Sequence, residues 1–574
     1  MQRPWQRIWG GAAGVIASTH RRRWADLFLL AGLVGLALGV LSLGRQWTGT
    51  IRPAVEIDLS FSALPRYMLF SLGRGLVAYC ISLALALGFG YWAAKDRLAG
   101  RVIIPLFDIL QSVPVLAFMP GLVLALIVLF PGSNTGLELA SIGMIVSGQT
   151  WNLFFSFVHS LRTVPAGLQE AARAYRFGFW QRFTRLEMPC AAMGLAWNSM
   201  LSMAGGWFFL IVCEAFTLGD RDFRLPGLGA YMSVAIARDD TRAMLSAIGA
   251  MIAIIILLDQ ILWRPVVVWA QKFRMEESAT TQEVSSWFLT WMRRSGLLGW
   301  MGEWRRRRAR RAAAASLRPP PPPRPPSRAA RAVPRLLFSS LVLILCAGVV
   351  QMVSLLRGVP SADWLEVMAA GGFSLLRVLA STALGTLWAL PVGLIIGLSP
   401  RVARVCQPVV QVLAAFPSPM LFPLLVVWLG VPLGWSSILL LAIGTQWYIL
   451  FNVIAGAMSV PADLRELARG YHFSRLLRLR RLYLPSVFPF LVTGWVTATG
   501  GAWNATIVAE YVRAGDEVRR TRGLGALISE AAAEANFPLL AAGVLLMAAL
   551  VVLFNRTVWR YCYRIAEERY GPSA

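Results

Sequence analysis

Long apolar windows without charged residues recur along the chain, and polar, arginine-rich segments separate them. A helix that spans a bilayer needs about 20 predominantly apolar residues, which is the order of length of these windows. The window 405–462 is too long for one helix, and we divide it at 430–434, where glycines flank a proline. The pattern predicts an all-α, polytopic membrane protein with about 12 transmembrane helices, six in each half. The windows are 27–44, 75–94, 109–137, 139–161, 188–213 and 244–263, then 336–356, 378–400, 405–462, 482–509 and 535–555.

The composition agrees with a membrane protein. Hydrophobic residues make up 57% of the chain and charged residues 15%, whereas soluble domains carry roughly 25% charged residues. The 55 basic residues outnumber the 29 acidic ones, but most arginines flank apolar windows, where they orient a membrane protein. We therefore expect no nucleic-acid partner. Because basic residues favour the cytoplasmic side, their distribution predicts that both halves begin and end in the cytoplasm.

Residues 271–334 separate the two halves and lack the pattern of a folded core. They run from an arginine cluster at 305–311 into a proline-rich run, which favours an extended, semi-rigid chain. We interpret 271–334 as an Arg/Pro-rich cytoplasmic linker between a first domain, 1–270, and a second domain, 335–574. A tether along anionic lipid and a docking motif for an aromatic groove both fit this composition.

The two halves contain an internal repeat. A shift of 303 residues aligns the segments around Arg74 and Arg377, which read Phe-Ser-Leu-Gly-Arg and Phe-Ser-Leu-Leu-Arg. After seven extra residues near 131–136, a shift of 296 holds to the end of the last window. Because each half has an even number of spans, both copies insert with the same topology. Two like-oriented bundles predict a transporter or channel. The second shift pairs Trp207 with Trp503, Glu214 with Glu510, and Gly227-Leu-Gly229 with Gly523-Leu-Gly525.

The longest inner loop of each half carries one pattern twice. Proline fits the first turn of a helix, so we expect short helices to begin near Pro165 and Pro461. Small residues follow in both loops, and a second backbone can approach such a face closely. The loops therefore predict docking sites for a partner protein. They read Glu170-Ala171-Ala172-Arg173 and Glu466-Leu467-Ala468-Arg469, and Pro189 and Pro485 are expected to restart the chain into the next span.

The loop pattern resembles the coupling motif of permease subunits in binding-protein-dependent ABC importers, where Leu-Pro follows the Glu of Glu-Ala-Ala after nineteen residues. The Ser-Leu-x-Arg segments, and the Glu followed by Gly-Leu-Gly, resemble the nitrate, sulfonate and taurine branch. The duplication resembles the fused anion-transport permeases of that branch. The resemblance covers about 66–265 and 369–560. The chain departs from the motif at Arg176 and His472, where the family has glycine, and at Met188 and Leu467.

The resemblance implies the permease component of an ATP-driven importer for a small anion such as nitrate, a sulfonate or taurine. Its partners would be two ABC ATPase subunits or domains, a periplasmic or extracellular solute-binding protein, and the lipid of a bacterial inner membrane. The chain itself would be no enzyme and would hold no cofactor; it contains no Gly-x-x-x-x-Gly-Lys-[Ser/Thr] phosphate loop. The implied coupling residues are Glu170, Ala171, Ala172, Arg173, Gly178, Pro189, Glu466, Leu467, Ala468, Arg469 and Pro485.

Polar and aromatic residues within the spans are candidates for the pathway or its gate. The two arginines could attract an anion, but snorkelling to the outer interface is the favoured interpretation. The two glutamates could contact a binding protein, or they could pair with Arg221 or Arg513 at the interface. For the remaining three, helix packing is the alternative to lining the route. The candidates are Arg74, Arg377, Trp207, Trp503, Asn504, Glu214 and Glu510.

Two other function classes compete with an importer. A twelve-span secondary transporter has the same arrangement, but such carriers usually place ionisable groups in mid-span and need no duplicated docking loops. A membrane scaffold held through the linker leaves the repeat unexplained. The six cysteines and three histidines are scattered, so we expect neither a disulfide framework nor a metal site.

Overall fold

The structure is a computed structural model, and it describes most of both copies of the repeat. The described ranges are 56–112, 114–131, 133–218, 221–273, 286–292, 346–421, 432–514 and 517–570, with the single residues 44, 46, 47, 304, 339, 340, 343 and 425. The predicted span 27–44 and most of the predicted linker 271–334 lie outside these residues. The described chain is almost entirely helical, as predicted; the strands within it form two short hairpins.

The first copy of the repeat runs from residue 64 to residue 273. Its helices in chain order are α2 (Leu64–Lys95), α3 (Arg97–Ser112), η2 (Val115–Phe118), α4 (Met119–Leu129), α5 (Thr135–Arg162), α6 (Ala166–Ala174), α7 (Phe179–Arg182), η3 (Phe183–Glu187) and α8 (Met188–Glu214). The hairpin of β1 (Ala215–Leu218) and β2 (Arg221–Arg224) follows, and then α9 (Leu228–Ala237), α10 (Thr241–Leu258), η4 (Asp259–Trp263), α11 (Arg264–Ala270) and η5 (Gln271–Phe273). The short helix α12 (Trp287–Met292) falls in the linker region.

The second copy repeats this order. It consists of α15 (Ser361–Leu398), α16 (Pro400–Ala415), η6 (Ser418–Met420), α18 (Leu433–Met458), α19 (Ala462–Gly470), α20 (Arg475–Arg478), η7 (Leu479–Tyr483) and α21 (Leu484–Ala509). The hairpin of β3 (Tyr511–Ala514) and β4 (Glu517–Arg520) follows, and then α22 (Leu524–Ala533), α23 (Phe537–Phe554), η8 (Asn555–Trp559) and α24 (Arg560–Tyr570). From α19 to η8, each element of the second copy begins 296 residues after its counterpart between α6 and η4 in the first copy. This constant shift confirms the repeat predicted from the sequence.

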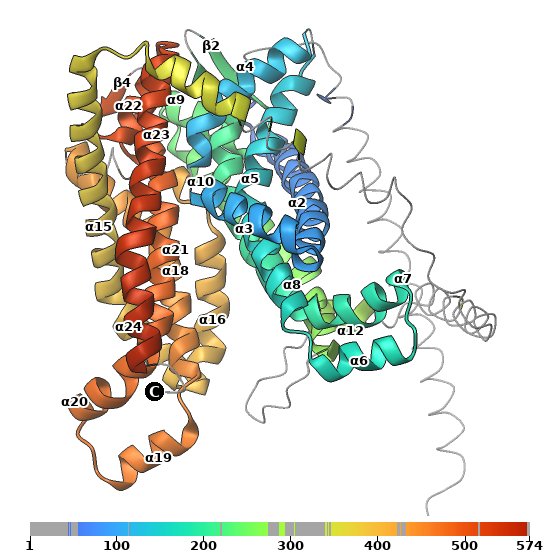
Figure 1. Ribbon diagram of the computed structural model, residues 1–574. Coiled ribbons are helices and arrows are strands. Elements are labelled where there is room, and N and C mark those ends of the chain that lie inside the picture. Colours follow the sequence, from blue (N-terminus) through green and yellow to red (C-terminus); the bar gives the residue numbers. More distant parts are fainter. Residues whose placement is uncertain are drawn as a thin grey trace, which may run out of the picture. The chain divides into compact units, whose positions relative to one another are not determined.

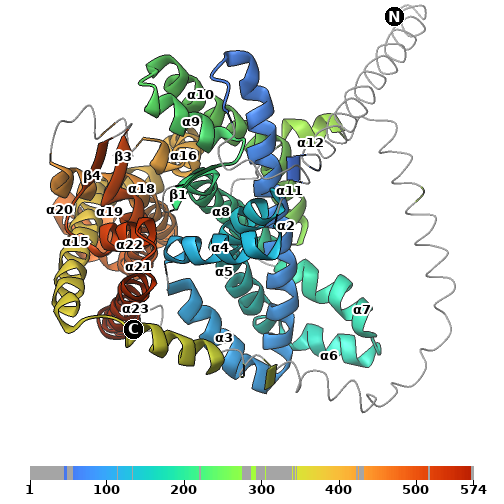
Figure 2. The ribbon, with the colours of Figure 1, turned by 90° about the horizontal axis from the view of Figure 1, so that it is seen from above.

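The contacts divide the chain into two compact units. One unit comprises Met1–Gly49, Asn152–Met200 and Ile256–Leu337, and the other comprises Thr50–Trp151, Leu201–Ile255 and Phe338–Ala574. The whole described part of the second copy therefore belongs to one unit. There, α15, α18 and α21 form the centre of a bundle around two apolar clusters, and Figures 1 and 2 show α23 beside them. Helices α19 and α20 lie at one end of this bundle, and β4 and α22 lie at the other (Figure 1).

Seven described helices are long and apolar enough to cross a membrane. Two of them begin well before the predicted start: α2 begins at Leu64 and α15 at Ser361, where the apolar windows predict 75 and 378. The difference arises because Arg74 and Arg377 are buried within the helices, so a window without charged residues cuts off the first turns. The division of 405–462 is confirmed, because α18 begins directly after Pro432.

The prediction of one continuous helix over 109–137 is wrong. Helix α3 ends at Ser112, the 3-10 turn η2 follows Pro114, and α4 covers Met119–Leu129. Proline lacks the N–H of a helical hydrogen bond and disfavours helical geometry in the residue before it. The chain therefore breaks at Pro114, and it breaks at the equivalent place in the second copy, where α16 ends before Pro417.

Pro189 and Pro485 lie in the first turn of α8 and α21, where the next span was expected to begin, but a π turn joins each of these helices to the one before it. The helices are continuous over Phe179–Glu214 and Arg475–Ala509, and each contains one π turn, η3 or η7, just before its proline. A proline ring in an α-helix clashes with the carbonyl four residues earlier. A π turn widens the helix locally and is one known way of relieving such a conflict.

Among the described residues, four that are not glycine have a positive φ angle. Arg176, Asp239, His472 and Ala535 have φ between 49° and 54°, and each directly follows the C-cap of a short helix. Their N–H groups bond the carbonyl three residues earlier, and the next N–H bonds the carbonyl five residues before it, as in the Schellman motif. An L-residue pays about 1–2 kcal/mol for this left-handed conformation. The four positions are two repeat-related pairs, so the backbone shape is common to both copies.

We predict that Ala535→Gly stabilises the chain by about 1 kcal/mol, because glycine adopts the left-handed conformation without steric cost. Ala535 is exposed, so no packing is lost. The measurement is the melting temperature of the detergent-solubilised chain. The control is Ala531→Gly in α22, where glycine is worse than alanine by about 1 kcal/mol and a buried methyl group is also lost, so the melting temperature falls. A lower melting temperature for Ala535→Gly would contradict the left-handed conformation of Ala535.

Candidate functional site

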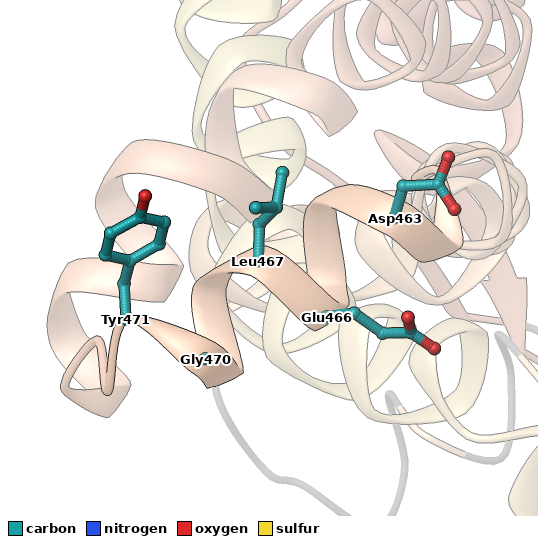
Figure 3. A pocket seen from close by; sticks show the side chains of 5 residues that line it. All are labelled: Asp463, Glu466, Leu467, Gly470 and Tyr471. Carbon is teal, nitrogen blue, oxygen red and sulfur yellow. The ribbon is translucent and has the colours of Figure 1, made fainter.

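The second loop helix, α19, presents an exposed surface at one end of the second bundle. It begins after Pro461, as predicted. Glu466 and Arg469 are exposed, Leu467 is 53% exposed, and Ala468 faces inward with 5% exposure. A shallow hollow of about 430 Å³ lies along the helix, and Figure 3 shows two carboxylates near one end of it and a tyrosine ring at the other. Its lining residues are Asp463, Glu466, Leu467, Gly470 and Tyr471.

The first loop helix, α6, has the same backbone and a different surface. It begins after Pro165, as predicted, and Ala172 occupies the buried position. Glu170 and Arg173 are exposed and Ala171 is half-buried. Ala172 belongs to a small apolar cluster with Val164 and Leu186. The helix therefore rests on the loop that follows it and leaves its glutamate outward.

Both loop helices end in the same left-handed turn even though the sequence departs there from glycine. Arg176 and His472 have φ of 49° and 50°. The N–H of Phe177 donates to the Ala172 carbonyl at 2.9 Å, and the N–H of Phe473 donates to the Ala468 carbonyl at 3.0 Å. The geometry that glycine would favour is thus retained, because these hydrogen bonds satisfy the last carbonyls of the helix.

The turn after each loop helix leads into the next helix through a capping residue. Gly178 precedes α7, and its N–H donates to Gln181 Oε1 at 3.1 Å. The equivalent residue, Ser474, caps α20 by accepting from the N–H of Leu477 at 3.2 Å. Phe179 and Trp180 on α7 are 55% and 71% exposed, whereas α20 presents arginine and leucine at the equivalent positions.

A cluster of buried charges joins α2, α5, α8 and α9, and we name it the first ion cluster (Ser71, Arg74, Glu138 and Glu214). Arg74 Nε and Nη2 donate to the two carboxylate oxygens of Glu138 at 2.6 and 2.8 Å. Arg74 Nη1 donates to Glu214 Oε1 at 2.7 Å, and so does Ser71 Oγ. All four side chains are 0% exposed. A bidentate guanidinium–carboxylate pair is among the stronger hydrogen-bonded contacts in proteins.

The first ion cluster also holds the start of α9. Gly229 N–H donates to Glu214 Oε2 at 2.7 Å, and Leu228 N–H donates to Ser71 Oγ at 2.9 Å. These donors are unpaired N–H groups of a helix N-terminus, where a negative charge is stabilised. Gly227 has no room for a side chain, since a Cβ there would lie 2.3 Å from the Glu214 carboxylate. This steric contact explains the Glu and Gly-Leu-Gly pattern seen in the sequence.

The second copy contains a related group, the second ion cluster (Ser374, Arg377, Glu510 and Thr521). Arg377 Nη1 donates to Glu510 Oε1 at 2.9 Å, and Ser374 Oγ donates to the same oxygen at 2.7 Å. Gly525 N–H donates to Glu510 Oε2 at 2.8 Å. The Arg377 guanidinium also donates from Nη1 to the Arg522 carbonyl at 2.8 Å and from Nη2 to Thr521 Oγ1 at 2.9 Å.

The two ion clusters differ in one carboxylate. The shift of 296 places Gly434 where the first copy has Glu138. The first ion cluster therefore has two carboxylates for one guanidinium, and the second has one for one. The Arg74 side chain is 0% exposed and that of Arg377 is 10% exposed.

The expectation that both arginines snorkel to the outer interface is wrong. Each arginine is buried in an ion pair with the glutamate at the end of α8 or α21 in its own copy. The structure pairs Glu214 with Arg74 and Glu510 with Arg377. The prediction of interfacial pairing considered only partners close in sequence. Glu138 and the two serines were missed. The available signal was a lone acidic residue in an otherwise charge-free region, and a serine three residues before each arginine.

The two tryptophans among the remaining pathway candidates are buried. Trp207 and Trp503 are 2% and 3% exposed, and a Cβ at Gly75 would lie 3.8 Å from the Trp207 ring. Asn504 Oδ1 accepts from the N–H of Val115 at 2.8 Å, at the start of η2. This bond satisfies one N–H that the break in the first copy leaves without a helical partner.

The comparisons with known proteins bear on both copies. The family model described as "Binding-protein-dependent transport system inner membrane component" matches residues 86–262 and again 389–565. Together the two matches cover more than half of the chain, and each contains one loop helix. The chain belongs to this family. It is thus a duplicated ABC importer permease, as the sequence predicted.

Individual relatives are similar to parts of this permease. The taurine transport system permease protein TauC of Escherichia coli is 28% identical over 182 residues, which are 32% of this chain and 64% of that protein. The nitrate import permease protein NrtB of Leptolyngbya laminosa is 29% identical over 148 residues, 25% of this chain and 50% of that protein. The putative aliphatic sulfonates transport permease protein SsuC of Bacillus subtilis is 28% identical over 175 residues, 30% of this chain and 61% of that protein. The permease thus spans between half and two thirds of the length of these relatives.

We predict that Arg74→Gln strongly destabilises the permease, because it leaves two buried carboxylates without their cation; breaking a buried ion pair costs about 3–5 kcal/mol. The double variant Arg74→Gln/Glu138→Gln removes one of these orphaned charges and recovers part of the loss. The measurement is folded yield and melting temperature by size-exclusion chromatography and thermal unfolding in detergent. If the double variant is no more stable than Arg74→Gln alone, the two residues do not form one cluster.

Proposed function

We propose that this permease forms the translocation pathway for a small anion in an ATP-driven importer. The proposal is supported most directly by the repeat: two loop helices, α6 and α19, recur 296 residues apart with exposed glutamates, Glu170 and Glu466. A secondary transporter has no use for such a pair. The anion is proposed from the relatives, whose names refer to taurine, nitrate and aliphatic sulfonates.

In this proposal each loop helix docks on one ABC ATPase subunit or domain. Ala172 and Ala468 are buried, whereas Glu170 and Glu466 are exposed, so the faces with the two glutamates are those available to a partner. A solute-binding protein delivers the anion at the other end of the second bundle, where β4 and α22 lie (Figure 1). Both termini and the linker 271–334 then lie in the cytoplasm of a bacterial cell, on the ATPase side of the inner membrane.

The proposed function is tested by reconstitution. The permease is co-purified with an ATPase and a solute-binding protein encoded beside it, placed in liposomes, and assayed for uptake of labelled nitrate, methanesulfonate and taurine. We expect uptake of at least one of these solutes that requires both ATP and the binding protein, in a complex of one permease chain and two ATPase domains. Uptake without ATP would support a secondary transporter instead. Two permease chains in each complex would contradict the fused, pseudo-twofold arrangement.

We predict that the two loop helices contribute unequally to ATPase binding. The second loop adds Asp463 on α19, where the first has Gly167, and its following segment carries more arginines. More charge at an exposed contact makes docking more sensitive to salt. Glu466→Ala should therefore lower ATPase co-purification more at low salt than at high salt, and Glu170→Ala should show a smaller salt dependence. The arginines are Arg475, Arg478, Arg480 and Arg481, against Arg182 and Arg185.

The matched control for this experiment is the pair Leu168→Ala and Leu464→Ala. These leucines occupy equivalent positions and are similarly exposed, at 42% and 44%, and they carry no charge. Their substitution should give a salt-independent loss in both copies. Equal losses for the two glutamate variants at every salt concentration would refute the asymmetry. Full transport and ATPase binding in the Glu170→Ala/Glu466→Ala double variant would overturn the docking role itself.

A further inference from the structure

The two copies of the repeat present the same guanidinium group with different partners. In the first ion cluster, the edge of Arg74 formed by Nε and Nη2 is held by both oxygens of Glu138, at 2.6 and 2.8 Å. In the second ion cluster, the corresponding edge of Arg377 bonds the neutral hydroxyl of Thr521 at 2.9 Å. Within the described part of the chain, no carboxylate lies on that edge of Arg377.

The lack of a side chain at Gly434 explains the difference between the two guanidinium edges, and this position lies directly against Thr521 and Arg377. A Cβ at this position would lie 3.3 Å from Thr521 Oγ1 and 4.0 Å from Arg377 Nη2. Apart from the residues adjacent to Gly434 and the backbone of its own helix, no other described atom would lie within 4 Å of that Cβ. Position 434 therefore lies next to one edge of the Arg377 guanidinium. In the first copy, Glu138 binds the corresponding edge of Arg74. The absence of a side chain there removes the carboxylate and keeps the arginine.

We propose that Arg377, with Thr521, is a contact site for a small oxyanion at the outer end of the second bundle. The Glu138 carboxylate in the first copy shows how a planar oxyanion binds this edge: two oxygens meet Nε and Nη2 together. Nitrate, a sulfonate and bicarbonate each present two oxygens in a comparable way. Thr521 exchanges its bond to Nη2 for a bond to the anion. This proposal rests on the proposed function, because it assigns a residue to the anion that the importer carries.

The first ion cluster shows that a guanidinium at this place can hold two anionic groups at once. The first ion cluster holds one guanidinium and two carboxylates permanently, and all its members are fully buried. The second ion cluster holds one guanidinium and one carboxylate, and one bound monovalent anion would bring it to the same balance. A guanidinium is well suited to this exchange, since it binds carboxylates and phosphates in a planar, bidentate manner. The first copy, in contrast, already holds its own carboxylate and would repel an anion.

The surroundings of Arg377 add positive charge. Arg519, Arg520 and Arg522 are exposed on β4 and the segment after it, and Arg520 forms an ion pair with Glu530. Arg522 accepts a bond from Arg377 through its carbonyl and places its own guanidinium over the Phe373 ring, 5.5 Å from the centroid. At the equivalents of 519, 520 and 522, the first copy has phenylalanine, arginine and proline. Exposed like charges of this kind raise the local concentration of anions.

The decisive experiment compares Gly434→Glu with Gly434→Gln. The two side chains have nearly the same size, but only glutamate supplies the carboxylate that Glu138 supplies in the first copy. Anion binding to the purified permease is measured by isothermal titration with sodium nitrate and sodium methanesulfonate, against sodium chloride at equal ionic strength. Uptake kinetics are measured in the reconstituted importer. We expect Gly434→Glu to raise the dissociation constant and the KM for the anion at least tenfold, and Gly434→Gln to raise them less than threefold.

Two further variants keep the proposal testable if position 434 tolerates no side chain. Thr521→Val removes the hydroxyl and should raise the dissociation constant about threefold to tenfold. Arg377→Lys retains the charge and loses the bidentate edge, so it should weaken binding of nitrate and methanesulfonate at least tenfold while the ATPase still co-purifies. The control is Glu138→Gln in the first copy, for which no loss of anion affinity is expected.

The outcomes separate this inference from the function on which it rests. Wild-type anion affinity in Gly434→Glu, Thr521→Val and Arg377→Lys, with intact ATP-dependent uptake, would overturn the anion site and leave the importer standing. Weaker binding in Gly434→Glu and Gly434→Gln alike would indicate a steric effect and also overturn it. Failure of the wild-type complex to take up any of the anions would instead contradict the proposed function.

Discussion

The contact on which the described structure most depends is the buried pair between an arginine within α2 or α15 and a glutamate at the end of α8 or α21. An isolated charge within a membrane span is costly, and a buried ion pair compensates that cost only when its geometry is good and its other hydrogen bonds are satisfied. Both conditions hold here. Glu214 and Glu510 each accept bonds from an arginine, a serine and a glycine N–H. Because the glycine N–H belongs to α9 or α22, the pair sets where that short helix begins.

The steric requirements around this pair are as strict as the electrostatic ones. The glutamate carboxylate lies so close to the first glycine of Gly-Leu-Gly that a Cβ there would overlap it, and a Cβ at the second glycine of the first copy would lie 2.4 Å from the Ile211 carbonyl oxygen. Removing the arginine would therefore expose the carboxylate to an apolar environment without giving the chain room to rearrange. This combination explains why serine, arginine, glutamate and two glycines, distant in sequence, occur together in both copies.

Duplication has kept the backbone and changed the side chains. The π turns, the proline breaks, the hairpins and the left-handed turns recur at equivalent positions of the two copies, even where Arg176 and His472 replace the residue best suited to positive φ. The hydrogen bonds of the helix end outweigh the conformational cost of about 1–2 kcal/mol. The differences lie where partners and solutes would be met: Ala171 against Leu467 on the loop helices, and Glu138 against Gly434 beside the buried arginines.

The sequence by itself determined the membrane class, the duplication and the loop helices. Apolar windows, a constant shift and a proline before a small-residue helix are local or periodic properties, and they depend only on residues that are neighbours along the chain. The tertiary structure alone decided what happens to the charges. Arg74 and Glu214 are 140 residues apart, and their burial depends on four helices meeting at one point. Because each charge was taken as the edge of a span, the predicted starts of α2 and α15 were too late. For the same reason the arginines were expected at the outer interface. A charge in a membrane protein is tolerated inside when a distant partner neutralises it, and only the folded chain shows that partner.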